Sequence, residues 1–293
     1  MSSVPHLLIA GLGYAARAVA RDALASGMRL GATRRPGTAP MAGVDFVDFT
    51  DVAARIGLAT HLLVSVPPDA DGDPLLSLAG QAIAAAIAQG RLHWIGYLST
   101  TGVYGDRAGA WVDETTPPAP ASPRSQRRRA AEQAWEAFAP ACAVDLFRLA
   151  GIYGPGRSAF DDLRAGRARR VLRPGHLFGR IHRDDIARAV LAAIRTAPGQ
   201  GLRVFNLADD VPAESADVIA HAAALLGLPT PPAIPFAEAE PGMSAMARSF
   251  WAESRRVSSA HSQATLGIAW RYPSYREGLA AVLAEENAAR LAR

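Results

Sequence analysis

Lysine is absent from this chain of 293 residues, so all 31 of its basic side chains are arginine. A guanidinium stays protonated and forms no Schiff base, which excludes lysine-based covalent chemistry and a P-loop lysine. Cysteine occurs once, at Cys142. A single cysteine excludes an internal disulfide and a cysteine-based zinc site, and we predict no metal site.

Long apolar runs are also missing. Pro5 and His6 interrupt the opening of the chain, so we expect neither a signal peptide nor a membrane span. A hydrophobic content of 49% with 20% charged residues is typical of a folded globular protein, which we expect in the cytoplasm. The net charge of +4 is basic, but no recognisable reader module accompanies it, so we predict no nucleic-acid partner.

The most informative stretch is His6–Arg35, HLLIAGLGYAARAVARDALASGMRLGATRR. An apolar run leads into a G-x-G-x-x-A turn at Gly11–Ala16, and an alanine-rich segment and a second apolar run, Met28–Thr33, follow. This order is typical of the first βαβ unit of a dinucleotide-binding fold. The first glycine allows the tight turn, and the second lets backbone N–H groups approach a pyrophosphate at the helix N-terminus. We therefore predict a bound dinucleotide at Gly11, Gly13, Tyr14 and Ala15.

Strands and helices alternate along most of the chain, which predicts an α/β fold with a doubly wound parallel sheet. Further strands are expected at residues 43–49, 61–66, 92–98, 144–149 and 203–207. Helices are expected at residues 51–57, 74–89, 125–139, 184–195, 214–226 and 275–290. The proline-rich segment 229–241 predicts an exposed loop or linker.

Several motifs in order resemble the extended short-chain dehydrogenase/reductase superfamily, the NAD-dependent epimerase/dehydratase group. They are the glycine turn, LSTTGVYG at 98–105, FRLAGIYGPGR at 147–157, RIHRDDIARAV at 180–190 and FNLADD at 205–210. The resemblance implies a Rossmann domain of residues 1–155 with about 184–208. It also implies a smaller C-terminal substrate lobe of residues 156–183 and 209–293, in a monomer or homodimer.

The chain departs from this family at the catalytic residues. The family uses a Ser/Thr, a tyrosine and a lysine four residues after it, and Thr100 matches the first. Counting from Glu132, the other two positions fall on 124 and 128, or one residue later on 125 and 129. Neither register supplies a tyrosine, so we predict an atypical member that lacks the Tyr-x-x-x-Lys pair. Arg128 is a candidate to bind the nicotinamide ribose, and the alternative is a solvated helix face.

Three tyrosines elsewhere are less favoured as replacements for the missing catalytic tyrosine. Tyr104 and Tyr153 resemble structural positions of the family, and Tyr97 lies within a predicted strand.

The end of the second strand predicts the cofactor. Here Thr33, Arg34 and Arg35 stand where NAD-binding units carry an acidic residue, and a guanidinium matches the 2′-phosphate of NADP. We predict NADP(H), with NAD less favoured; the alternative is a pair of exposed surface arginines. The resemblance further implies cofactor contacts at Asp48 and Phe49 beside the adenine, at Ser65, Val66 and Pro67 along the ribose and pyrophosphate, and at Thr100 near the nicotinamide.

Arginines crowd residues 157–183, the region that meets the substrate in extended relatives, often a nucleotide sugar. The resemblance implies a small anionic or phosphorylated substrate bound by Arg157, Arg173 and Arg180; the alternative is a solvated basic hairpin. His182 is a possible acid/base but resembles a position that braces the lobe junction. Glu114 is interpreted as a loop-fixing residue.

Two functions follow from these observations. The first is an NADP-dependent oxidoreductase or sugar-nucleotide-modifying enzyme with a non-standard acid/base. The second is a non-catalytic NADP(H)-binding redox sensor or regulatory module. Thr100 and the substrate lobe favour the enzyme, whereas the missing tyrosine and lysine favour the sensor.

Overall fold

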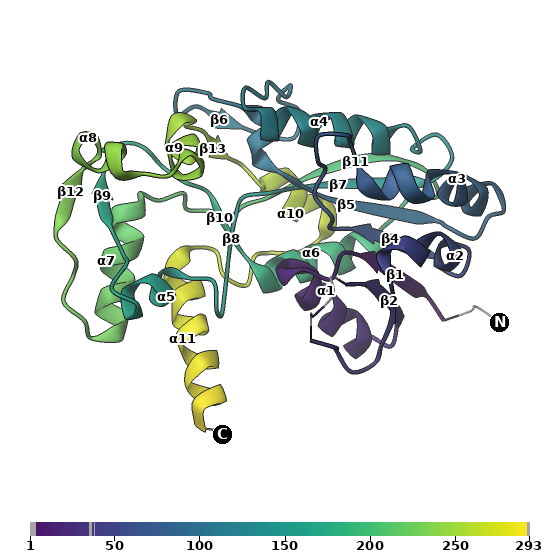
Figure 1. The fold of residues 1–293 in the computed structure, drawn as a ribbon, viewed down its shortest axis with the longest axis horizontal. Coiled ribbons are helices and arrows are strands. Elements are labelled where there is room, and N and C mark those ends of the chain that lie inside the picture. The colour runs from purple at the N-terminus through teal and green to yellow at the C-terminus, as the bar shows by residue number, and fades with distance from the viewer. Residues whose placement is uncertain (1–3, 35–36, 38, 292–293) are drawn as a thin grey trace.

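A seven-stranded parallel sheet forms the centre of the protein in a computed structural model that describes residues 4–34, 37 and 39–291 (Figure 1). Its order is β11-β7-β5-β4-β1-β2-β3, and the direction of winding reverses between β1 and β4. The predicted doubly wound α/β fold of the Rossmann type is therefore confirmed. The strands are β1 His6–Ala10, β2 Arg29–Thr33, β3 Val44–Val47, β4 His61–Val64, β5 Trp94–Thr100, β7 Ala143–Leu149 and β11 Gly201–Leu207.

Helices cover both faces of the sheet because its strands are apolar on both sides. Side chains of β1 alternate between two cores, with Leu7 and Ile9 in one and Leu8 in the other. The first core includes residues of α1 (Tyr14–Ala25), α6 (Arg183–Arg195) and the C-terminal α10 (Ala260–Leu266). The second includes residues of α2 (Val52–Ile56), α3 (Pro74–Ala88) and α4 (Pro123–Glu136).

A third core belongs to a smaller lobe beside the carboxyl ends of the strands (Figure 1). Phe160, Val218 and Leu279 pack together there, from α5 (Ala159–Arg164), α7 (Ser215–Leu226) and α11 (Tyr275–Leu291). The lobe is completed by parallel strand pairs and short helices: β8 Gly151–Tyr153 with β10 Arg180–His182, β9 Arg170–Leu172 with β12 Ala233–Pro235, α8 Phe236–Ala239 and α9 Ala245–Ala252. β13 (Arg256–Val257) then pairs with β6 (Trp111–Val112) and returns the chain to the large domain.

The prediction of a loop at residues 229–241 was wrong in part. This segment contains β12, α8 and a 3₁₀ turn, η3 (Glu240–Gly242). A non-local pairing with β9 supplies the hydrogen bonds that make β12 a strand, so its local sequence carries little signal for it.

A buried ion pair joins α4 to the sheet. Glu132, fully buried, accepts two hydrogen bonds from Arg148 of β7, at 3.1 and 2.9 Å, and one from Ser99 of β5 at 2.5 Å. Arg148 also donates to the hydroxyl of Tyr104 at 3.0 Å, which in turn donates to Asn206 of β11 at 2.8 Å. The network therefore fixes α4, three strands and the 3₁₀ turn η2 (Thr101–Tyr104) relative to one another.

Candidate functional site

The turn between β1 and α1 has the close packing that requires glycine. Gly11 has a φ of +88°, and a Cβ atom there would lie 2.8 Å from Cγ2 of Val66. Its N–H donates to the hydroxyl of Thr33 at 2.8 Å, and the next N–H, of Leu12, donates to the Thr33 carbonyl. Thr33 is 1% exposed, so its buried hydroxyl fixes the turn from the end of β2.

The N-terminus of α1 suits an anion such as a pyrophosphate. No side chain caps this end of the helix, and its first turn carries no acidic residue. Gly13, Tyr14 and Ala15 line a cavity of about 960 Å³, together with Ser65 from the end of β4. An uncapped helix N-terminus with glycine at its entrance is the arrangement that binds dinucleotide phosphates, so these residues fit the predicted cofactor.

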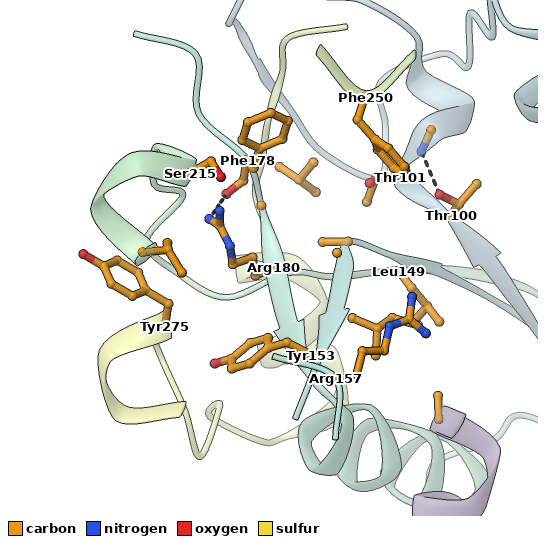
Figure 2. A pocket seen from close by; sticks show the side chains of 18 of the residues that line it. Thr100, Thr101, Leu149, Tyr153, Arg157, Phe178, Arg180, Ser215, Phe250 and Tyr275 are labelled. Atoms are coloured by element: carbon orange, nitrogen blue, oxygen red, sulfur yellow. Dashed lines mark hydrogen bonds between the residues drawn. The ribbon is translucent and has the colours of Figure 1, made fainter. Parts of the chain in front are cut away.

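The cavity extends from this turn into the smaller lobe (Figure 2). Thr100 and Thr101 line it at the end of β5, and Phe250 of α9 is drawn on the same side of the view. The lobe side is formed by Phe178, Arg180, Ser215 and Tyr275. Sequence reasoning missed Phe178, Ser215, Phe250 and Tyr275, because only the docking of the lobe brings these separate segments together.

Thr100 and Arg128, the two candidate catalytic residues, both line the cavity. The Thr100 hydroxyl accepts the Gly102 N–H at 3.1 Å, which fixes its rotamer. One nitrogen of Arg128 donates to the Tyr97 hydroxyl at 3.1 Å and to the Leu98 carbonyl at 3.0 Å. These two hydrogen bonds fix the charged guanidinium of Arg128 at the carboxyl end of β5.

The two registers considered for α4 differ in which arginine reaches the cavity. Arg129 turns away from it and pairs with Glu132 at 3.1 Å and with Glu136. Arg124, Ser125 and Arg128 line the cavity. The structure therefore brings the 124/128 positions to the site, and of the 125/129 positions only Ser125.

The residues predicted around the adenine lie near the ends of β2, β3 and β4. The guanidinium of Arg34 lies 4.8 Å from the ring centre of Phe46. Asp48 is exposed and precedes the 3₁₀ turn η1 (Phe49–Asp51), Phe49 and Val66 pack partly against the second core, and Pro67 is exposed. Arg35 lies outside the described residues.

The three arginines predicted to bind substrate are divided between two cavities. Arg157 and Arg180 line the large cavity, whereas Arg173 lines a smaller pocket of about 320 Å³ beside α9. Arg173 donates to the carbonyl of Trp251 and lies over the ring of Phe236. Its guanidinium is thus engaged within the lobe.

The other candidate acid/base groups are held in structural contacts. Burial raises the pKa values of Tyr97, Tyr104 and Tyr153. Burial lowers the pKa of His182 to about 4, and its Nδ1 accepts the Asp184 N–H at 3.2 Å. Glu114 accepts hydrogen bonds from the Asn206 N–H and the Ser262 hydroxyl, as a loop-fixing residue does.

Asp209 is a buried carboxyl at the junction of sheet and lobe. One oxygen accepts the Arg180 N–H at 3.3 Å, and the other has no hydrogen-bond partner among the described residues. Asp209 is 2% exposed, and this burial raises its pKa to about 8, although the nearby Arg180 opposes the shift. The carboxyl is therefore protonated near neutral pH.

Within the described residues, no group of three or more His, Cys, Asp and Glu side chains could hold a metal ion. None of the helices in that part of the chain is both long and apolar enough to cross a bilayer.

Comparison with known proteins identifies the family. No family model matches the chain. Protein YeeZ of Escherichia coli K12 is 30% identical over 244 residues, which cover 76% of this chain and 84% of YeeZ. A solved structure of a putative NAD-dependent epimerase/dehydratase from Methylobacillus flagellatus is 25% identical, with a TM-score of 0.74 over 97% of this chain and all of that one. The chain belongs to the NAD-dependent epimerase/dehydratase family, within the extended short-chain dehydrogenases/reductases.

Other solved structures share the fold. A conserved protein of unknown function from Silicibacter pomeroyi DSS is 41% identical, with a TM-score of 0.82 over 97% of this chain and 99% of that one. At 20% and 16% identity, two structures show the same fold: MoeE5 with UDP-glucuronic acid and NAD, and the human epimerase family protein SDR39U1 with NADPH. Structures of this fold thus hold either NAD or NADPH.

Substitution of Gly11 tests whether the close packing of the turn matters for binding. Gly11→Ala combines the strain of a positive φ with the contact to Val66, so we expect loss of NADPH binding. Gly27→Ala is the matched control, since Gly27 has a φ of +83° and a Cβ there meets no atom within 4 Å. The control should lose roughly 1 kcal/mol of unfolding free energy and keep the wild-type Kd for NADPH. Equal NADPH affinities in the two variants would contradict this assignment.

Asp209 should make stability fall as pH rises. Its folded pKa of about 8 exceeds its ordinary value of 3.8, so the folded state keeps a proton that the unfolded chain releases between these values. In Asp209→Asn this contribution is absent. The unfolding free energy of the variant should therefore improve relative to the wild type between pH 4 and 8, by up to about 1.4 kcal/mol per pH unit. If the unfolding free energies of the two proteins, measured with urea, change in parallel over this pH range, the raised pKa of Asp209 is refuted.

Proposed function

We propose that this protein binds NADP(H) and acts on a small anionic substrate, as a cytoplasmic oxidoreductase or sugar-nucleotide-modifying enzyme. The observation that carries the proposal is a single cavity that joins the glycine turn to a wall of the lobe containing Arg180. Thr100 and Arg128 line the same cavity, so a dinucleotide at the glycine turn and an anion at the Arg180 wall would meet beside them. MoeE5, which shares the fold, was solved with a UDP-sugar and NAD, a precedent for both kinds of ligand in one molecule.

The choice of NADP over NAD rests on the end of β2. Arg34 follows this strand directly, and its guanidinium over Phe46 is held at the edge of the sheet where the adenosine ribose of a Rossmann cofactor lies. The two residues at this end, Thr33 and Arg34, include no carboxylate for ribose hydroxyls. Arg34 is accordingly assigned to the 2′-phosphate, whereas Thr33 is assigned to the glycine turn that its hydroxyl supports.

The chemistry at Thr100 would differ from that of a tyrosine-lysine pair. A bound nicotinamide would supply hydride transfer. Arg128 contributes a permanent positive charge, and the hydroxyls of Thr100 and Ser125 line the same part of the cavity. Such a set orients and stabilises an oxygen that carries negative charge, but the guanidinium itself does not exchange a proton near neutral pH.

Cofactor preference is tested by titration of NADPH and NADH into the purified protein. We expect tighter binding of NADPH, and in Arg34→Ala a loss of about tenfold or more in NADPH affinity with little change for NADH. Arg55→Ala serves as the control, because Arg55 pairs with the exposed Asp45 at 3.1 Å on the neighbouring strand. Tighter binding of NADH by the wild type would refute the preference.

Turnover separates the enzyme from the sensor. With nucleotide sugars and small phosphorylated or carboxylated carbonyl compounds, we expect one class to consume NADPH, followed by the absorbance of the reduced nicotinamide. Thr100→Val removes the hydroxyl at nearly constant volume and should lower kcat at least tenfold while the Kd for NADPH stays within about twofold. If NADPH binds tightly but none of the compounds leads to its oxidation, the non-catalytic sensor is favoured instead; the absence of lysine from the chain supports that alternative.

A further inference from the structure

Arg157 lines the large cavity and forms no ion pair with a described residue. Its side chain is exposed, and no carboxylate among the described residues lies within ion-pair distance of it. Two carboxylates that line the same cavity already have partners: Asp161 accepts the Ser158 N–H at 2.7 Å, and Asp162 pairs with Arg167 at 3.1 Å. The charge of Arg157 is therefore available to an anionic ligand.

The backbone around Arg157 is fixed against the first residue of α1. Gly154 and Arg157 exchange backbone hydrogen bonds of 3.1 and 3.0 Å, which close a tight turn. The Tyr14 hydroxyl donates to the Pro155 carbonyl within this turn at 3.0 Å. A Cβ at Gly154 would lie 2.6 Å from that hydroxyl, so turn and helix interlock.

The guanidinium of Arg157 itself lies beside α1. It stands 5.6 Å from the ring centre of Tyr14, and Arg183 lies 5.7 Å from the same ring. The two arginines differ in charge balance, because Arg183 is neutralised by Glu285 at 2.6 Å and lies 3.4 Å from Asp184. Of these two arginines, Arg157 is the one without a carboxylate partner among the described residues.

Arg157 and Arg180 point to opposite ends of the cavity (Figure 2). Arg180 reaches toward the lobe and donates to the carbonyls of Phe178 and Ala213 at 2.9 and 3.0 Å. Arg157 instead points toward Leu149, the last residue of β7. One arginine thus faces the lobe and the other faces the carboxyl edge of the sheet at the end of β7.

We propose that Arg157 binds the pyrophosphate of the dinucleotide rather than the substrate, opposite the N–H groups that begin α1. This inference rests on the proposed cofactor site and deepens it. The glycine turn offers backbone donors to one side of a diphosphate, and a guanidinium on the facing turn supplies charge-assisted hydrogen bonds to the other side. The cofactor would then tie the Gly154–Arg157 turn of the lobe junction to α1.

Three ligands distinguish the parts of the cofactor. NADPH and 2′-phospho-ADP-ribose contain the pyrophosphate, whereas adenosine 2′-monophosphate contains the 2′-phosphate alone. We expect Arg157→Gln to weaken the first two by about tenfold and to leave the third within about twofold, measured by calorimetric titration. Arg157→Lys keeps the charge and should recover part of the loss.

Arg164→Gln is the matched control. It removes an arginine of the same segment whose charge is already balanced by Glu286 at 2.6 Å, so all three affinities should stay at wild-type values. Circular dichroism of each variant reports whether the fold is retained. Adenosine 2′-monophosphate serves as a second measure, since a misfolded site would lose it as well.

The outcomes separate this inference from the proposed function. If the wild type binds none of the three ligands, both are overturned. If the wild type binds all three and Arg157→Gln binds NADPH equally well, only the assignment of Arg157 fails, and a substrate role for it is favoured. An equal loss of all three ligands in Arg157→Gln would also overturn the assignment, because the effect would not be specific to the pyrophosphate.

Discussion

The buried ion pair between Glu132 and Arg148 is the constraint on which the site depends. Removal of two charges from water is costly, and here the cost is offset by several hydrogen bonds, including those from Ser99 and to Tyr104. The pair fixes α4 against the sheet in one rotational setting. Because Arg128 lies one helical turn before Glu132 on the same face, this setting also brings Arg128 to the cavity.

Local signals made the large domain predictable, and tertiary contacts decided what the sequence left open. The glycine turn, the apolar strands and the helix periodicity act over a few residues, so the order of elements and the Rossmann-type sheet follow from them. No such local rule predicts which arginine of the run Arg127–Arg129 faces the cavity. Only the placement of Glu132 in the core shows that Arg129 is used for ion pairs, while Arg128 binds the Tyr97 hydroxyl and the end of β5.

The lobe was less predictable because its structure is built from distant segments. β9 pairs with β12 across about sixty residues, and β8 pairs with β10 across about thirty. The apolar walls of the cavity, Phe178 and Phe250, likewise come from segments about seventy residues apart. A single sequence contains no period or turn that relates such segments. The cluster of arginines was visible in the sequence, but its division between two cavities was not.

The lack of lysine has a chemical consequence that extends through the cavity. In the usual family arrangement an ammonium lowers the pKa of a tyrosine so that a phenolate can take part in proton transfer. Here burial raises the pKa values of Tyr14 and Tyr153, both of which line the cavity, so each stays a neutral phenol at physiological pH. The arginines that line the cavity, Arg128 and Arg157 among them, are permanent charges. We infer that neither the neutral phenols nor the guanidiniums act as the base of a reaction here, so proton abstraction from a substrate would require another hydroxyl, a water molecule or the substrate itself.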